Sequence, residues 1–287
     1  MSLTFLGDVC LDINVVRGEP RREIGGGVYH GAVTACRLGC PVQVLTKARA
    51  QDRHHFHEIE QAGADITWAP SATSTSIRND YPSEDPDDRI SRVISQAEPF
   101  TPAEIQGLHA AALHVNPLWM GMVPPSLLAL LRPRVGLLGA DAQGFLRRVA
   151  PDGSAAHQPW PEAEEHLRLL DVLKVDIVEA RTLTGIEDRH AAAAALLAMG
   201  AGTVLLTHHA GVLAARGAEL CERPWGAWTL EGRTGRGDTC TAAFLVGLLR
   251  GEPLALALDL AARVTTAKMS YRGPYRGEPT PSTAAIR

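Results

Sequence analysis

The sequence predicts an α/β fold in which a mostly parallel central sheet lies between layers of helices. From about residue 101 onward, short apolar segments that suit buried strands alternate with longer segments of helical periodicity. Strands separated by helices pair in parallel, and such a sheet is covered on both of its faces. The chain has 287 residues, 45% of them hydrophobic, so it can bury a large core without disulfides or metals.

The first third of the chain begins with the same alternation and then departs from it. Strands are expected over residues 3–9 and 42–46, and helices over 27–38 and 53–62. The first of these helices follows Gly25-Gly26-Gly27. Between residues 65 and 100, Thr/Ser turns and short alternating stretches predict small strands on a projecting element rather than core.

The rest of the chain supplies the main sheet and its helices. Thr101 and Glu104 have the spacing of a capping box at the start of a helix, and Gly200 suits a helix end. Further strands are expected over 112–115, 135–138, 172–175 and 204–207, then in short pieces to about 224. Helices are expected over 102–109, 124–131, 162–170, 178–184, 190–199, 238–249 and 253–268. Without a recognisable linker, residues 1–287 form one domain, with a small β element drawn from parts of 10–25 and 65–100.

Charge and cysteine content exclude several classes of protein. The formal net charge is −4, from 28 basic and 32 acidic residues, which argues against a nucleic-acid binder that neutralises phosphates. Five cysteines without a Cys-x-x-Cys pair suit reduced thiols better than a disulfide framework or a zinc ribbon. Neither a signal peptide nor an apolar run of about 18 residues is recognisable. We therefore expect a cytoplasmic protein with no nucleic-acid or membrane partner.

One segment near the C-terminus carries the clearest chemical signal. Thr234-Gly235-Arg236-Gly237-Asp238 is a glycine-broken turn that leads directly into an apolar helix. The first turn of a helix has unpaired N–H groups and a partial positive charge, and glycines before it let more N–H groups face an anion. Asp238 suits two roles: it can cap the helix, or it can accept the proton of a substrate hydroxyl beside a bound phosphate. The segment alone leaves both open.

This loop differs from two other phosphate-binding loops. No Gly-Lys-Ser/Thr follows the glycines, so it is not a Walker A loop. A dinucleotide fingerprint would follow the first strand and precede an acid by about 20 residues, whereas these glycines lie near the C-terminus. A nicotinamide-dependent oxidoreductase therefore fits the sequence poorly.

The N-terminal region suits a polyhydroxylated substrate. Asp8 and Asp12 flank the end of the first predicted strand, and the helix after it begins at Gly26-Gly27. Carboxylates accept hydrogen bonds from hydroxyl groups, and glycine N–H groups allow close approach of a ligand. A plain strand end and a glycine turn would leave the same pattern.

Two later segments suit a phosphate donor and its cation. Asp176 and Glu179 lie three residues apart at a strand-to-helix junction, where acids suit the helix dipole or hold Mg²⁺ through water. Thr207 ends a buried strand, and the turn after it closes at Gly211. The ends of strands are where open α/β sheets usually bind ligands.

In this order, the segments resemble the PfkB (ribokinase-like) family of carbohydrate and nucleoside kinases, from residue 7 to about 274. The strongest match is the run from Thr234 to Asp238, which is similar to the family signature Asp-Thr-x-Gly-Ala-Gly-Asp. The resemblance implies a ribokinase-like three-layer α/β/α fold whose small β element is a lid over the sugar. It also implies that Asp238 is the catalytic base and that the N–H groups of Gly235, Arg236 and Gly237 form an anion hole.

The remaining site residues follow from the same resemblance together with the residues themselves. The acceptor substrate is expected at Asp12, Gly26 and Gly27. The nucleotide is expected at Thr207, Gly211 and Thr234, and Mg²⁺ at Glu179 through water, with Asp176 beside it.

The sequence also departs from the family pattern. Arg233 and Arg236 stand where the signature has Asp and Ala, Asp176 where a metal-side motif has Asn, and His208 where the nucleotide loop has Gly. The run from Asp141 to Arg147, together with Val172-Leu173-Lys174, is similar to the plant myo-inositol kinase branch of the family.

The sequence therefore predicts an ATP-dependent phosphotransferase that acts on a hydroxyl of a sugar, a polyol (inositol among them) or a nucleoside. ATP and Mg²⁺ are the expected cofactors, and a monovalent cation is a further candidate. Exposed strand edges on the lid favour a homodimer. The alternative is a catalytically silent small-molecule-binding or regulatory protein on the same fold, which the departures at Asp176, His208 and Arg233 favour.

Overall fold

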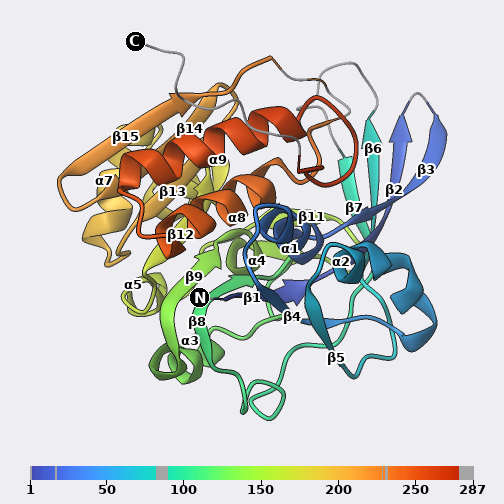
Figure 1. Cartoon of the computed structure of the whole chain (residues 1–287). Coiled ribbons are helices and arrows are strands. Elements are labelled where there is room, and N and C mark those ends of the chain that lie inside the picture. Colours follow the sequence, from blue (N-terminus) through green and yellow to red (C-terminus); the bar gives the residue numbers. More distant parts are fainter. Residues whose placement is uncertain (1, 17, 82–89, 228, 230–231, 278–287) are drawn as a thin grey trace.

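A computed structural model describes residues 2–16, 18–81, 90–227, 229 and 232–277, and its centre is a nine-stranded sheet (Figure 1). Its strands, in spatial order, are β15 (Glu219–Pro224), β14 (Gly211–Arg216), β13 (Val204–His208), β12 (Val172–Asp176), β9 (Val135–Asp141), β8 (Ala110–Asn116), β1 (Leu3–Asp8), β4 (Val42–Lys47) and β5 (Asp65–Ala69). The seven strands from β13 to β5 pair in parallel. Strands β14 and β15 add an antiparallel edge.

Helices cover both faces of this sheet. One face packs on α1 (Gly27–Arg37), α8 (Arg236–Leu249) and α9 (Leu254–Lys268), in front of the sheet in Figure 1. The other face packs on α3 (Ser126–Leu131), α5 (Ala163–Leu167), α6 (Ile177–Thr184) and α7 (Arg189–Ala198). Alternate side chains of one strand enter the two cores: Leu205 of β13 joins the first, and its neighbours Val204 and Leu206 join the second. The three-layer α/β/α arrangement with a mostly parallel central sheet, expected from the sequence, is confirmed.

A second sheet of four strands stands beside the main one, at the upper right of Figure 1. Its order is β3 (Glu19–Gly25), β2 (Cys10–Val16), β6 (Ser76–Tyr81) and β7 (Ile90–Ser95). These strands fall in the two segments where the sequence predicts small strands, although β5, also in the second segment, joins the main sheet; residues 82–89 lie outside the described part. That this sheet closes as a lid and pairs with a second copy stays a prediction.

The prediction of a helix over residues 102–109 is wrong, although a hydrogen bond of its predicted cap is present. The Thr101 N–H donates to a Glu104 side-chain oxygen at 2.8 Å, yet the chain there makes turns. The other Glu104 oxygen pairs at 2.8 Å with buried Lys47, and Arg134 donates to the carbonyl of Ile105 at 3.0 Å. These tertiary contacts fix the segment in turns, and one of them occupies the carbonyl of Ile105.

Smaller elements complete the chain. They are a 3₁₀ helix (Ala50–Phe56), α2 (His57–Gln61), a 3₁₀ turn (Arg132–Arg134), α4 (Gln143–Leu146), and the β10 (Arg147–Val149) and β11 (Ala155–His157) hairpin. No helix in the described ranges is long and apolar enough to span a membrane.

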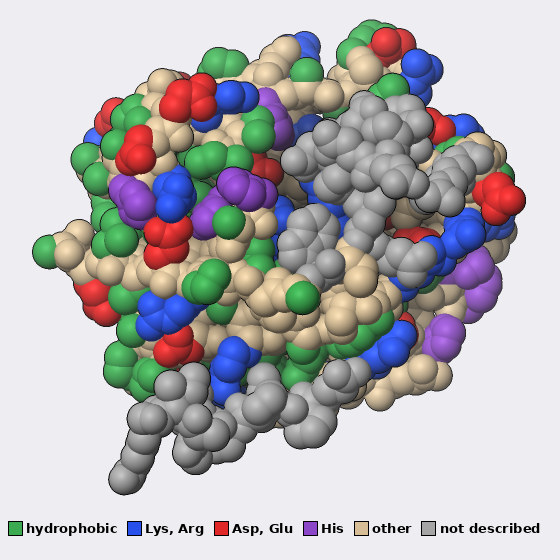
Figure 2. Space-filling model, turned by 90° about the horizontal axis from the view of Figure 1, so that it is seen from above, with side chains coloured by type: hydrophobic (Ala, Val, Ile, Leu, Met, Phe, Trp, Pro, Cys, Tyr) green, Lys and Arg blue, Asp and Glu red, His purple; other side chains and the backbone are tan. Residues whose placement is uncertain are grey.

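Polar residues end the parallel strands at one edge of the main sheet. Asp8, Asn116, Asp141, Asp176 and His208 are the last residues of β1, β8, β9, β12 and β13. Because parallel strands present all their carboxyl ends on the same side, these residues face a common region. The second sheet and the start of α8 border that region, and in the view from above basic side chains are visible in a hollow in the middle of the face (Figure 2).

Candidate active site

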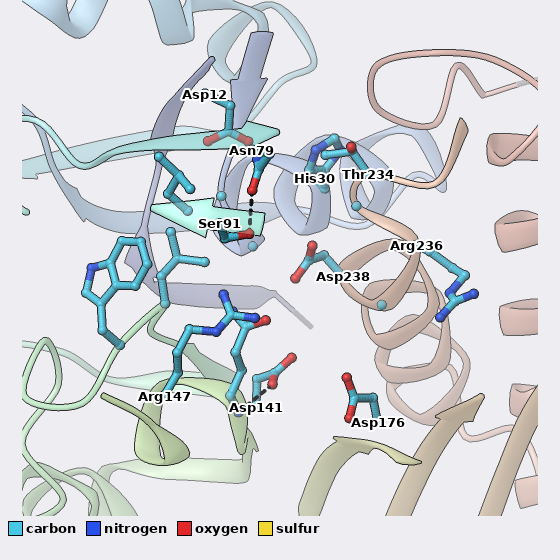
Figure 3. Close-up of a pocket in the computed structure, with 18 of the residues that line it drawn as sticks. Asp12, His30, Asn79, Ser91, Asp141, Arg147, Asp176, Thr234, Arg236 and Asp238 are labelled. Atoms are coloured by element: carbon cyan, nitrogen blue, oxygen red, sulfur yellow. Dashed lines mark hydrogen bonds between the residues drawn. The ribbon is translucent and has the colours of Figure 1, made fainter. Parts of the chain in front are cut away.

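A cavity of about 200 Å³ lies at this edge, between the second sheet and the start of α8 (Figure 3). Its charged and polar lining is drawn from both sheets, from α1 and from α8. Four glycines line it, Gly26, Gly27, Gly235 and Gly237. The charged and polar side chains that line it include Asp12, His30, Asn79, Ser91, Asp141, Arg147, Lys174, Asp176, Thr207, Arg233, Thr234, Arg236 and Asp238.

The start of α8 leaves main-chain N–H groups open to the cavity. Gly235 is the N-cap residue, has φ 79° and carries no side chain, and no other side chain caps the helix. A Cβ at this position would lie 2.3 Å from the ring of His30, so only glycine fits. The N–H of Arg236, expected in the anion hole, donates to the carbonyl of Arg233 at 3.1 Å. Within the described residues, no acceptor forms a hydrogen bond with the N–H of Gly235 or Gly237, and both residues line the cavity.

The carboxylate of Asp238 points into this cavity from the first turn of α8 (Figure 3). It is not the N-cap residue, and its Oδ1 accepts a hydrogen bond from Nδ2 of Asn116 at 3.1 Å. Burial and repulsion from Asp141 raise its pKa, while the nearby ammonium of Lys174 and the Asn116 bond oppose the rise. A raised pKa and a fixed orientation suit a carboxylate that accepts a proton.

The side chain of Asn116 fits closely against Gly27, which has no side chain of its own. A Cβ on Gly27 would lie 2.1 Å from Asn116 Nδ2, so the amide occupies the space that any larger residue at position 27 would need. Asn116 is 1% exposed, and no described group donates a hydrogen bond to its Oδ1. The close fit directs the amide donor at Asp238.

A buried cation lies behind the anion hole. Lys174, at 6% exposure, pairs with Asp141 at 3.1 Å and approaches Glu179 at 3.7 Å. A Cβ on Gly237 would lie 3.3 Å from its Nζ, so the ammonium is close to the first turn of α8. Burial alone would lower the pKa of Lys174, but the carboxylates of Asp141 and Glu179 outweigh it and raise that pKa.

Asp176 and Glu179 form a capping box at the start of α6. Asp176 Oδ1 accepts from the Glu179 N–H at 2.8 Å, and Glu179 Oε2 accepts from the Asp176 N–H at 2.7 Å. Glu179 is 1% exposed and does not line the cavity, whereas Asp176 does. In the described ranges, no three His, Cys, Asp or Glu side chains are grouped as a metal site. Asp141 and Asp176 together suit Mg²⁺ that also takes phosphate oxygens and water, because Mg²⁺ is commonly held by one or two carboxylates in that way.

The opposite wall of the cavity comes from the second sheet. Ser91 of β7 donates to Asn79 at 2.7 Å, Asn79 of β6 donates to Asn14 at 3.0 Å, and Asn14 of β2 donates to Glu23 of β3 at 2.7 Å. This row of hydrogen bonds crosses all four strands and fixes the Asn79 and Ser91 side chains at the cavity. Figure 3 shows the bond between Ser91 and Asn79. Asp12, 6% exposed, lines the same wall.

Most of the site residues expected from the sequence meet at this cavity. Ten of them line it: Asp12, Gly26, Gly27, Asp176, Thr207, Thr234, Gly235, Arg236, Gly237 and Asp238. Glu179 does not line it, and neither does Gly211, the first residue of β14, where a Cβ would meet the carbonyl of Arg223 at 2.3 Å. The roles of all twelve remain proposals.

Sequence reasoning assigned no role to seven residues at this site: His30, Asn79, Ser91, Asn116, Asp141, Arg147 and Lys174. Of these, only Lys174 could have been found from the sequence, because a charged residue inside the apolar run Val172–Val175 needs a charged or polar partner. The others depend on pairings between distant strands.

Known proteins share this architecture. The sequence model of the pfkB family carbohydrate kinases matches residues 140–281. None of the curated proteins compared matches the chain. A solved pyrophosphate-dependent kinase of the ribokinase family, complexed with a pyrophosphate analogue and myo-inositol, is 40% identical, with a TM-score of 0.91 over 96% of this chain and 98% of that one.

Two further structures extend the comparison. In one, mutation of an asparagine and a serine to leucine converts a pyrophosphate-dependent myo-inositol-1 kinase into a myo-inositol-3 kinase; it is 39% identical, with a TM-score of 0.90 and 96% of each chain covered. Arabidopsis thaliana ribokinase, complexed with ribose and ATP, is 17% identical, with a TM-score of 0.74 over 97% of this chain and 95% of that one, which shows a common fold. With the family signature at the start of α8 and identity of about 40% over nearly the full length, the chain belongs to the PfkB, or ribokinase-like, family of carbohydrate kinases.

Proposed function

We propose that this protein transfers a phosphoryl group from inorganic pyrophosphate to a hydroxyl group of a cyclic polyol of the myo-inositol type. One observation carries the proposal: the carboxylate of Asp238 shares a small cavity with the open N–H groups of Gly235 and Gly237. A proton acceptor and an anion site thus lie side by side, as transfer of phosphate to a hydroxyl requires.

In the proposed reaction, the acceptor hydroxyl lies between Asp238 and the wall that carries Asp12, Asn79 and Ser91. Its oxygen attacks the terminal phosphorus of pyrophosphate, its proton passes to Asp238, and the bond to the leaving phosphate breaks. The N–H groups of Gly235 and Gly237 stabilise charge on the transferring group, and Lys174 adds positive charge behind them. Phosphoryl transfer depends mainly on such positioning and electrostatics.

Pyrophosphate suits the cavity better than the ATP expected from the sequence. A volume of about 200 Å³ and a mostly polar lining suit two small polar ligands. The β13–β14 turn, where the sequence predicts the nucleotide, is tied to β15 and the segment after it: the Trp225 indole donates to the carbonyl of His208 at 2.9 Å, and the His208 ring lies 3.1 Å from Glu222. Relatives of about 40% identity are pyrophosphate-dependent.

Asp141 and Asp176 are the residues that would hold Mg²⁺ together with the donor. The ion neutralises phosphate charge when it is bound. Lys174, paired with Asp141, holds that carboxylate at the cavity.

A donor and acceptor screen tests the proposed function. With myo-inositol as acceptor, pyrophosphate is expected to give inositol phosphate and free phosphate, whereas ATP gives little product; ³¹P NMR measures both. Faster transfer from ATP would restore the nucleotide as donor. Ligand-induced stabilisation without any product, over a panel of polyols, sugars and nucleosides, would favour the silent binding protein.

The Asn79–Ser91 pair is expected to select which hydroxyl is phosphorylated. A double variant with Asn79→Leu and Ser91→Leu removes every hydrogen-bonding group of the pair, so the polyol ring must turn to find other partners. By analogy with the relative that changes product after an asparagine and a serine become leucine, we expect the product to change from the 1-phosphate to the 3-phosphate. Chiral chromatography of the product measures this.

The matched control uses the neighbouring pair on the same strands. Arg78 and Arg92 are the next partners along β6 and β7, and neither lines the cavity. Leucine at both is expected to leave the product unchanged. An Asn79→Leu/Ser91→Leu enzyme that still makes only the original product would show that this pair does not orient the acceptor.

A further inference from the structure

Lys268, the last residue of α9, has a completely buried ammonium group. Its Nζ donates to the carbonyl of Gly232 at 2.6 Å and to the carbonyl of Thr234. No carboxylate in the described part of the chain lies within ion-pair distance of it. The cation is therefore held by main-chain oxygens, which are the kind of ligands that K⁺ takes in proteins.

Such a cation is costly to bury. Moving an ammonium group out of water costs several kcal/mol in a protein after relaxation. Burial lowers the pKa of Lys268 to about 8, although the charges of Asp238 and Glu23 oppose the shift. The negative end of the α9 dipole also favours a cation there. The chain has three lysines, all of them buried: Lys47 and Lys174 pair with carboxylates, whereas Lys268 binds main-chain carbonyls.

The two carbonyls that Lys268 binds belong to the segment that leads into the anion hole. The carbonyl of Thr234 and the N–H of Gly235 are parts of one planar trans peptide, in which the two groups point in opposite directions. When Lys268 fixes that carbonyl on one side, the N–H of Gly235 is fixed toward the other. Gly235 lines the cavity, so the ammonium sets the direction of a donor in the anion hole.

We propose that Lys268 is a built-in monovalent cation: a positioning residue that holds the 232–235 segment as a bound K⁺ or NH₄⁺ would, so that the enzyme needs no free monovalent cation. The inference rests on the proposed function in one respect, that the anion at Gly235 is the pyrophosphate donor. The sequence left a monovalent cation as a candidate cofactor, and this geometry supplies the charge from within the chain.

The test compares monovalent salts in the wild type and in two variants. Wild-type transfer is expected to be the same in K⁺, Na⁺ and tetramethylammonium chloride at equal ionic strength. Lys268→Ala opens space at the two carbonyls and is expected to lower kcat by about 10²-fold, the effect of losing one anion-hole donor. Ammonium or methylammonium restores its rate, whereas tetramethylammonium does not. Lys268→Met keeps the volume without the charge, so ammonium restores nothing.

Pyrophosphate affinity, measured by calorimetry with the same salts, is a second readout that does not need turnover. Lys268→Ala is expected to bind pyrophosphate more weakly, and ammonium is expected to restore the affinity. If no enzyme form phosphorylates a polyol but pyrophosphate affinity still follows ammonium, the proposed reaction fails and the role of Lys268 stands. A wild type that K⁺ activates several-fold, or a folded Lys268→Met enzyme with full rate and affinity, would overturn the inference; the first measurement holds even where the variants do not fold.

Discussion

Replacement of Asp238 by asparagine is expected to lower the rate of polyol phosphorylation by about 10²–10⁴-fold, the usual contribution of a general base. Asparagine has nearly the same shape and can still contact Asn116, so the melting temperature should change little. Steady-state kinetics with pyrophosphate and calorimetric binding of both substrates measure the effect. We expect a loss in kcat with nearly unchanged pyrophosphate affinity, because the variant loses proton transfer rather than the donor site.

Asp188 offers a matched control for the capping interpretation of Asp238. It caps α7 through the N–H groups of His190 and Ala191, at 3.1 and 2.8 Å, and it does not line the cavity. Asp188→Asn should keep full activity, because asparagine is an equally good N-cap. If Asp238→Asn also kept full activity, Asp238 would have no role as a base.

The pH dependence of kcat/KM in the wild type also tests the role of Asp238 as the base. Burial raises the pKa of Asp238, so its carboxylate becomes protonated, and unable to accept a proton, at a higher pH than a free aspartate would. The acidic limb of kcat/KM should therefore lie above the ordinary value of 3.8. A limb at or below that value would assign the titration to another group.

Replacement of Lys174 by methionine is expected to destabilise the protein by about 3–5 kcal/mol, the usual cost of breaking a buried ion pair by removing one partner. The ammonium lies 3.1 Å from the buried carboxylate of Asp141 and 3.7 Å from that of Glu179. Without it, both carboxylates lose the ion pair that offsets their burial. Denaturant unfolding at pH 7 measures the loss, and the same variant should lose phosphoryl transfer, because the charge behind the anion hole is gone.

Two companion variants separate stability from activity. Adding Glu179→Gln to the Lys174 variant removes one of the two buried acids and should restore part of the stability without restoring transfer. Lys47→Met breaks another buried pair, with Glu104 at 2.8 Å, away from the cavity. It should cost stability while the folded enzyme keeps its rate. A Lys174→Met protein as stable as the wild type would contradict the buried pairing.

Most strands and helices could be predicted because their signals are local. Apolar runs such as Val204–Leu206 and the periodic stretch in α9 need no distant partner to be recognised. The segment 102–109 could not, because the contacts that replace its helix come from Lys47 and Arg134, each far away in the chain.

The candidate site divides in the same way. The glycine-broken turn before Asp238 is readable, since open N–H groups at a helix start follow from the order of residues. The ion pair between Asp141 and Lys174 depends on the register of β9 and β12, in which these two residues are partners across 33 positions of sequence. The Asn116–Asp238 bond spans 122 positions and depends on the packing of β8 against the start of α8. No periodicity in one sequence encodes such distances.

The close fit of Asn116 against Gly27 has a consequence for anyone who wishes to redesign this enzyme. Enlarging residue 27 alone would collide with the amide that steers the base, and shrinking residue 116 alone would leave that base unsteered beside a hole. Useful changes at these two sites must come as a pair, so libraries that vary one position at a time will miss them.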